Sequence, residues 1–185
     1  LNYNQFKAGQ KFLHRPGLTV TQQDNKDEAL DTINHAQLHY DQHYAEQTEW
    51  KQCLGVSTMT LQKVIGMTSK TFARKQRILC FDDISMTHPV FGGDTLYSES
   101  EILDTSDYPD DEKAGLLTVK AQGRNQHGDI VATVTYKMLV CKDAVNYDGV
   151  EDEKFASHSL CDDGSLMEQV GIYYEDLIPG ETYEH

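Results

Sequence analysis

The stretch STMTLQKVIGMTSKTF, residues 57–72, carries the longest helical pattern in the chain. Its apolar side chains recur three and four positions apart, which places them along one face of a helix. Ser57 is a residue type that caps helix N-termini, so it marks the expected start. A helix with one apolar stripe buries that stripe against a second layer. The stripe consists of Leu61, Val64, Ile65, Thr68 and Phe72.

Four segments with the composition and alternation of β-strands follow this helix. The last two are separated by Gln126-His127-Gly128, where glycine suits the tight turn of a hairpin. A long helix followed by consecutive antiparallel strands predicts an α+β fold, with the helix packed on a curved sheet. The expected strands are residues 78–86, 94–103, 115–125 and 129–141.

The region before the long helix is more irregular. Residues 3–14 read as an entry segment that turns at Gly9, and residues 18–21 as a short β-prone run. A helix is expected over residues 24–33, capped by Thr21 or Asp24. The tract NHAQLHYDQHYA, residues 34–45, is expected to turn and then enter a short helix.

Charge separates a nearly neutral body from an acidic tail. Residues 143–185 hold twelve Asp and Glu against one Lys, which is −11 of the total net charge of −14 and leaves −3 for residues 1–142. We expect residues 1–142 to form one domain and residues 143–172 an acidic linker. Residues 143–167 are expected to pack poorly, because their charge density opposes burial.

One internal repeat bears on the domain organisation. NYNQFKAGQKFLH, residues 2–14, aligns without a gap to YYEDLIPGETYEH, residues 173–185, with Tyr, Gly and His at identical places. The likeness is either chance or the start of a second, related unit at residue 173. We favour repetition, because the aromatic and aliphatic positions match as well.

The charge balance and the composition also exclude some classes of protein. Nucleic-acid binding needs a basic face to displace counterions. The net charge of −3 over residues 1–142 argues against such a face. No apolar run approaches the roughly 18 residues of a membrane span, so no membrane insertion is expected. The four cysteines have no CxxC spacing, which is typical of reduced thiols in a cytoplasmic protein.

The tract of residues 34–45 concentrates side chains that move protons or hold metals, including three of the eight histidines. MaoC-type hot-dog hydratases carry a motif of the form D-x-N-P-L-H-x-D, and NHAQLHYD, residues 34–41, resembles it. His39 falls on the motif's catalytic histidine and Asn34 on its catalytic aspartate. Ala36 and Gln37 stand where Asn-Pro is usual. Asn in the first position resembles the branch that handles branched, dicarboxylic CoA esters of the mesaconyl and itaconyl type.

A second segment, HPVFGGDTL, residues 88–96, resembles the strand-entry motif P-V-x-x-G-D-T-L of the same family. The resemblance spans Tyr3 to Cys141. It implies a hot-dog fold, in which a curved antiparallel sheet wraps a long central helix. It also implies sheets that pair edge to edge, in a homodimer or in an intrachain double hot-dog.

The resemblance implies an enzyme that adds or removes water at a short 2-enoyl- or 3-hydroxyacyl-CoA thioester, with no cofactor besides this acyl-CoA substrate. His39 would then transfer the proton. Asn34 cannot take a proton, so its role would be to orient water or a substrate carboxylate. A backbone N–H of Ser57 or Thr58, at the start of the central helix, would stabilise the enolate oxygen.

Two other functions stay open at this point. A non-catalytic hot-dog half would bind acyl-CoA without turnover, since fold alone does not secure activity. A hot-dog thioesterase usually relies on a carboxylate near the central helix, and residues 53–68 contain no Asp or Glu.

His35, His39 and His43 lie four residues apart and could bind zinc on a continuous helix. The family motif implies a turn within this stretch, which separates the three side chains, so we expect no metal site. His35 and His43 would then be surface histidines without a role in binding metal.

Four of the sixteen basic residues fall within residues 70–77 and are candidates for binding the CoA phosphates. The alternative is a solvated helix end, where the helix dipole favours cations. These residues are Lys70, Arg74, Lys75 and Arg77.

Overall fold

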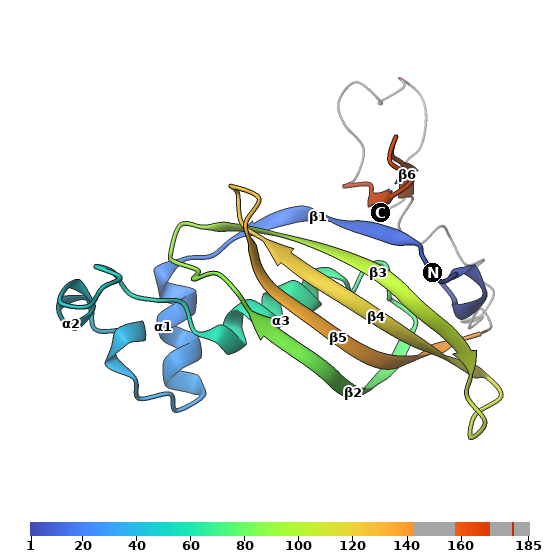
Figure 1. Cartoon of the computed structure of the whole chain (residues 1–185), viewed down its shortest axis with the longest axis horizontal. Coiled ribbons are helices and arrows are strands. Elements are labelled where there is room, and N and C mark those ends of the chain that lie inside the picture. Colours follow the sequence, from blue (N-terminus) through green and yellow to red (C-terminus); the bar gives the residue numbers. More distant parts are fainter. Residues whose placement is uncertain (143–157, 171–178, 180–185) are drawn as a thin grey trace.

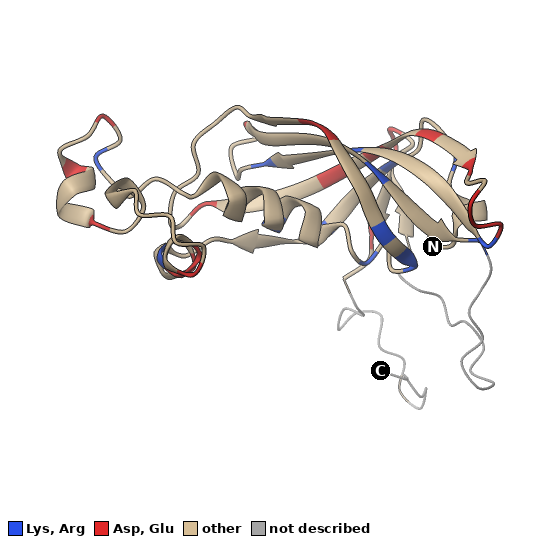
Figure 2. Ribbon diagram, turned by 90° about the horizontal axis from the view of Figure 1, so that it is seen from below, with Lys and Arg blue, Asp and Glu red and all other residues tan. Residues whose placement is uncertain are grey.

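The computed structural model describes residues 1–142, residues 158–170 and Pro179. A curved sheet of seven strands forms one layer, and a helix lies along one of its faces (Figures 1 and 2). The helices are η1 (Tyr3–Gln5), α1 (Gln22–Asp31), η2 (Gln37–His39), α2 (Gln42–Glu46) and α3 (Ser57–Met67). The strands are β1 (Lys11–Thr19), β2 (Lys75–Met86), β3 (Thr95–Asp107), β4 (Ala114–Arg124), β5 (Ile130–Cys141), β6 (His158–Leu160) and β7 (Leu166–Glu168).

The strand order is β2-β5-β4-β3-β1-β7-β6, and every neighbouring pair is antiparallel except β1 with β7. The four strands expected after the helix are confirmed as β2 to β5. Gly128 has a φ of +88° in the hairpin between β4 and β5, the conformation for which glycine was expected. The α+β class is therefore confirmed.

Helix α3 packs on the inner face of the sheet with the expected stripe. Val64, Thr68 and Phe72 are buried, and Leu61 and Ile65 pack against the core from its margin. The helix is shorter than expected, since it ends at Met67 and passes into turns through Phe72. The Thr68 hydroxyl donates to the Ile65 carbonyl, which draws the last turn away from α-geometry.

The two edges of the sheet differ. Beyond β1 the sheet continues into the short strands β7 and β6, and β7 pairs with β1 through Phe12 opposite Leu166 and Leu13 opposite Met167. Strand β2 forms the other edge and pairs only with β5 among the described residues. Apolar side chains at this free edge are exposed, which leaves a surface suited to a further partner. They are Leu79, Phe81, Ile84 and Met86.

The expectation of poor packing over residues 143–167 is wrong for the described part of that range. Residues 158–167 hold strand β6 and most of β7, which continue the sheet, and Ser165 is buried. Residues 143–157 and the repeat expected at 173–185, apart from Pro179, lie outside the described residues. The boundary at residue 142 and the second unit stay predictions.

Candidate active site

The candidate site begins at the end of α1, where the chain reverses in a left-handed turn. The N–H of Asn34 donates to the Ala29 carbonyl and the N–H of Ile33 to the Leu30 carbonyl. This pair of bonds is a Schellman motif, whose central residue is usually glycine. Ile33 occupies that place with a φ of +57°. The turn directs the chain into η2, which carries His39 at its last position.

Asn34 is half-buried, and its side chain closes a local turn. Its Oδ1 atom accepts from the N–H of Ala36 at 3.2 Å. With Oδ1 so engaged, the Nδ2 group faces away from this backbone bond. No acceptor for Nδ2 occurs among the described residues. The side chain can therefore present N–H donors to a bound molecule.

The His39 side chain is held in one tautomer by the backbone. Its Nδ1 atom lies 2.8 Å from the Leu54 carbonyl oxygen. Because a carbonyl oxygen only accepts, Nδ1 carries the proton when the imidazole is neutral. Nε2 then keeps its lone pair. A half-buried histidine in this state is suited to act as a base.

Leu54 also connects His39 to the start of α3, which begins three residues later at Ser57. Gly55 lies between them, and a Cβ there would stand 2.6 Å from the Val90 carbonyl oxygen. Glycine is therefore required for the close approach, in which the Gly55 N–H donates to that carbonyl at 2.7 Å.

A cavity of about 280 Å³ opens at this junction. It lies between the start of α3 and the end of β2, so the free edge of the sheet borders it. His39 does not line it directly; Leu54, which accepts the His39 hydrogen bond, does. The lining residues are Trp50, Leu54, Gly55, Ser57, Thr60, Met86, Thr87, His88, Pro89 and Val90.

Ser57 and Thr58 open α3, although Val56 is the N-cap and not Ser57 as expected. The first N–H groups of a helix have no acceptor within the helix, and the dipole adds positive potential there. Ser57 is exposed and lines the cavity, whereas the Thr58 hydroxyl donates to Glu28 at 3.1 Å. The backbone at this end can therefore stabilise a developing negative charge.

Comparison with known proteins gives this arrangement a context. The chain matches the mesaconyl-CoA hydratase family over residues 1–182. It belongs to that family. No curated protein sequence gives a significant match.

Solved structures with the same fold confirm the MaoC-like hot-dog arrangement. A putative MaoC domain protein dehydratase from Chloroflexus aurantiacus matches with a TM-score of 0.73 and 19% identity, over 78% of this chain and 45% of that one. A conserved hypothetical protein from Mycobacterium tuberculosis with a double hot-dog fold matches with a TM-score of 0.70 and 18% identity, over 80% and 46%. The R-hydratase PhaJ1 from Pseudomonas aeruginosa matches with a TM-score of 0.62 and 17% identity, over 81% and 95%. The chain thus spans about half the length of the first two proteins.

The other histidines of the tract lie on separate elements of this member of the mesaconyl-CoA hydratase family. His35 precedes η2 and His43 lies in α2, and both are exposed. The turn between them interrupts the helical spacing that zinc binding would need. The described residues contain no group of three His, Cys, Asp or Glu side chains arranged to hold a metal ion.

The four basic residues lie beyond the opposite end of α3 from Ser57. The helix has 11 residues, so its two ends are about 16 Å apart. The Lys70 ammonium donates to the Gln169 carbonyl at 2.6 Å, so it already binds the backbone after β7. Arg74 is also engaged, whereas Lys75 and Arg77 begin β2. A role in binding CoA phosphates stays a prediction.

Two site residues escaped the sequence reasoning. Asn25 is fully buried in α1 and hydrogen-bonds to the backbone around His39. Glu28, also in α1, accepts from Thr58 at the start of α3 and from Gln62 in the middle of that helix. A carboxylate therefore does stand near the central helix, which weakens the sequence argument against a thioesterase. One available indication was that Asn25 and Glu28 share one face of α1, three residues apart.

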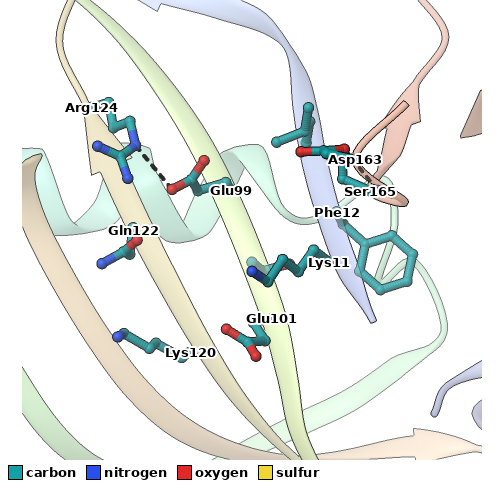
Figure 3. A pocket seen from close by; sticks show the side chains of 11 residues that line it. Lys11, Phe12, Glu99, Glu101, Lys120, Gln122, Arg124, Asp163 and Ser165 are labelled. Carbon is teal, nitrogen blue, oxygen red and sulfur yellow. Dashed lines mark hydrogen bonds and ion pairs between the residues drawn. The ribbon is translucent and has the colours of Figure 1, made fainter. Parts of the chain in front are cut away.

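A second cavity, of about 240 Å³, lies on the outer face of the sheet (Figure 3). Its wall includes three basic and three acidic side chains, and Arg124 pairs with Glu99 at 2.9 Å. Residues of opposite charge alternate across β1, β3 and β4, as Figure 3 shows for Glu101 and Lys120. The charges of this cavity lie opposite one another, and no histidine among the described residues lines it.

Ser100, His14 and Glu168 form a buried chain with the connectivity of a catalytic triad. His14 Nε2 lies 2.8 Å from the Ser100 hydroxyl and Nδ1 lies 2.9 Å from Glu168. All three are at most 4% exposed, so no substrate reaches them. Burial by itself raises the pKa of the Glu168 carboxyl, but hydrogen bonds from His14, Thr71 and Arg15 outweigh it and lower the pKa overall. The group therefore anchors β7 to the body.

None of the helices among the described residues is long and apolar enough to cross a membrane. The four cysteines are free thiols.

Proposed function

We propose that this protein is an acyl-CoA hydratase or dehydratase acting on a short 2-enoyl- or 3-hydroxyacyl-CoA thioester. The observation that carries the proposal is the 2.8 Å contact between His39 Nδ1 and the Leu54 carbonyl oxygen. It leaves Nε2 as a neutral base at the position where the family motif has its histidine. Membership of the mesaconyl-CoA hydratase family supports the reaction type.

In the hydration direction, His39 Nε2 takes one proton from water as the water oxygen bonds to the β-carbon. The electron pair of the double bond moves to the α-carbon and the thioester oxygen, giving an enolate. N–H groups at the start of α3, from Ser57 or Thr58, stabilise this oxygen. The imidazolium then returns the proton to the α-carbon, so a single histidine serves as base and acid.

The acyl group that we propose is branched or carboxylated. Asn34 carries no charge at any pH, and its Nδ2 group is free to donate because Oδ1 accepts from Ala36. An amide donor suits a substrate carboxylate, which an aspartate in the same place would repel. The mesaconyl-CoA hydratase family match favours the same substrate class.

We propose further that the functional unit contains two hot-dog sheets, either as a homodimer or as a double hot-dog. Strand β2 is the free edge, its apolar side chains are exposed, and the cavity beside α3 is open at the end of this strand. A second sheet paired along β2 would cover these side chains and wall the cavity. A cytoplasmic location stays a prediction.

One set of measurements separates this function from its alternatives. Loss of enoyl absorbance across a panel of plain, branched and carboxylated enoyl-CoA esters reports hydration. Release of free thiol from the same esters reports thioesterase activity. This alternative is tested because the Glu28 carboxylate lies near the central helix. Calorimetric binding of the esters with neither signal indicates a non-catalytic binding half, and that result would contradict the proposal.

A further inference from the structure

Asn25 is a buried polar residue near His39 that has no role in the reaction steps proposed above. It is fully buried on α1, and its side chain reaches three backbone groups from two other segments. Nδ2 donates to the His39 carbonyl at 2.9 Å and to the Leu54 carbonyl at 3.0 Å. Oδ1 accepts from the Val56 N–H at 2.7 Å. Both amide hydrogens and the oxygen are thus engaged, which fixes the amide orientation.

The Leu54 carbonyl is the point where Asn25 and His39 meet. This oxygen accepts one hydrogen bond from Asn25 Nδ2 and another from His39 Nδ1. Its direction therefore decides whether the imidazole proton sits on Nδ1. One N–H of the Asn25 amide fixes the direction of the Leu54 carbonyl, and the other binds the backbone carbonyl of His39. It is not among the residues that line the cavity, so it acts through His39 and not on the substrate.

We infer that Asn25 is a positioning residue that keeps His39 in the Nδ1–H tautomer, with Nε2 aimed at the reacting water. The inference rests on the proposed function, in which Nε2 is the base. Without the amide, the buried Val56 N–H loses its acceptor, and the His39 and Leu54 carbonyls each keep only one of two donors, from Gln22 and from His39. The loop can then relax. The imidazole then gains access to the Nε2–H tautomer, which cannot accept a proton from water.

The experiment compares Asn25→Ala with Asn125→Ala. Asn125 is also a buried amide, and its three hydrogen bonds close the β4–β5 hairpin without contacting His39. Both variants lose similar bonds, so both should lower the melting temperature. Asn25→Ser keeps one donor and one acceptor, and it carries the test if the alanine variant does not fold.

The decisive readout is the ¹⁵N spectrum of histidine side chains at a pH where imidazoles are neutral, with the His39 signals assigned from His39→Ala. We expect Nδ1–H in the wild type and in Asn125→Ala, and a substantial Nε2–H population in the Asn25 variants. We also expect kcat to fall on the order of 10- to 100-fold in the Asn25 variants with KM little changed, as for a misplaced catalytic group.

An unchanged His39 tautomer in a folded Asn25 variant overturns the inference. So does a wild type in which Nε2–H dominates. Failure of the proposed function has a different signature. In that case His39→Ala retains turnover, or no enoyl-CoA is hydrated, while the tautomer spectrum still answers the question about Asn25.

Discussion

The imidazole of His14 lies 2.9 Å from the carboxylate of Glu168, which is 154 residues further along the chain. Both side chains are fully buried. The carboxylate also accepts from the hydroxyl of Thr71 at 2.5 Å and from the backbone N–H groups of Thr71 and Arg15 at 3.1 Å. This contact joins the C-terminal strand to the first strand and to the turn after α3.

Removing the carboxylate should detach the C-terminal strand. Glu168→Ala removes the carboxylate partner of His14 Nδ1 and the acceptor of the backbone N–H groups of Arg15 and Thr71. The expected cost is about 3 kcal/mol in the free energy of unfolding. Denaturant unfolding measures this, with the exposed Glu49→Gln as the control, which should change stability little. Equal stability of the two variants would show that the buried pair contributes nothing.

The same pair predicts a dependence on pH. The pKa of Glu168 is lowered in the folded state from its ordinary value of 4.5, so the folded state favours the ionised carboxylate. Its contribution is fully present above pH 4.5 and is lost as the pH falls through the lowered pKa. The stability difference between wild type and Glu168→Gln should therefore shrink on acidification below pH 4.5. A difference that grows on acidification would give the opposite sign and contradict the shift.

His39→Ala should abolish proton transfer while the fold survives, because the side chain is only half-buried. We expect kcat to fall on the order of 100-fold or more. Circular dichroism checks the fold, and enoyl absorbance measures turnover. His35→Ala is the matched control, since His35 is exposed, lies four residues earlier and should leave turnover unchanged. Near-normal kcat in His39→Ala would remove this histidine from the mechanism.

Asn34 offers a test of substrate class. Asn34→Asp can still accept from the Ala36 N–H but can no longer donate, and it adds a charge. Turnover of plain enoyl-CoA should hold or rise, whereas turnover of a carboxylated ester should fall through like-charge repulsion. Asn34→Ala should lower both, and the acid limb of kcat/KM should report one group. If both variants match wild type on every substrate, Asn34 is a bystander.

Lys75 and Arg77 are the members of the basic cluster to test first, because Lys70 and Arg74 are already engaged. Replacing both by Ala should raise KM for CoA esters on the order of 3- to 10-fold. KM for pantetheine thioesters, which lack the nucleotide phosphates, should stay constant. Lys26 and Lys51, which are exposed elsewhere, give the control pair. An equal effect on both substrate types would indicate a structural role.

Ile33 adopts a left-handed φ that β-branched residues rarely tolerate, and its side chain is 71% exposed. Ile33→Gly removes this strain and loses little burial, so the free energy of unfolding should rise by about 0.5–1 kcal/mol. Lys51→Gly, at a φ of +58°, is the matched control and should behave alike. A lower free energy of unfolding for Ile33→Gly would contradict this prediction. It would indicate that the exposed Ile33 side chain packs against a second subunit.

Much of the fold was predictable because its causes are local. The spacing of Val64, Thr68 and Phe72 specified which face of α3 is buried, and Gly128 specified the hairpin turn. Both depend on conformational preferences within a few residues. The end of α3 was placed too late, since the Thr68 hydroxyl bond to Ile65 outweighs the apolar period.

The candidate site divides in the same way. The sequence alone determined that Asn34 and His39 lie five residues apart between two helices. In the structure Asn34 lies in the turn after α1 and His39 at the last position of η2. The tautomer of His39 was decided by Leu54 and Asn25, which lie 15 and 14 residues away. The packing of Glu168, within the described residues 158–170, was decided by His14, which accommodates a carboxylate that charge density alone would keep in water. A helix or a turn forms from its own residues, whereas a buried polar group finds its partner only when the whole chain has closed.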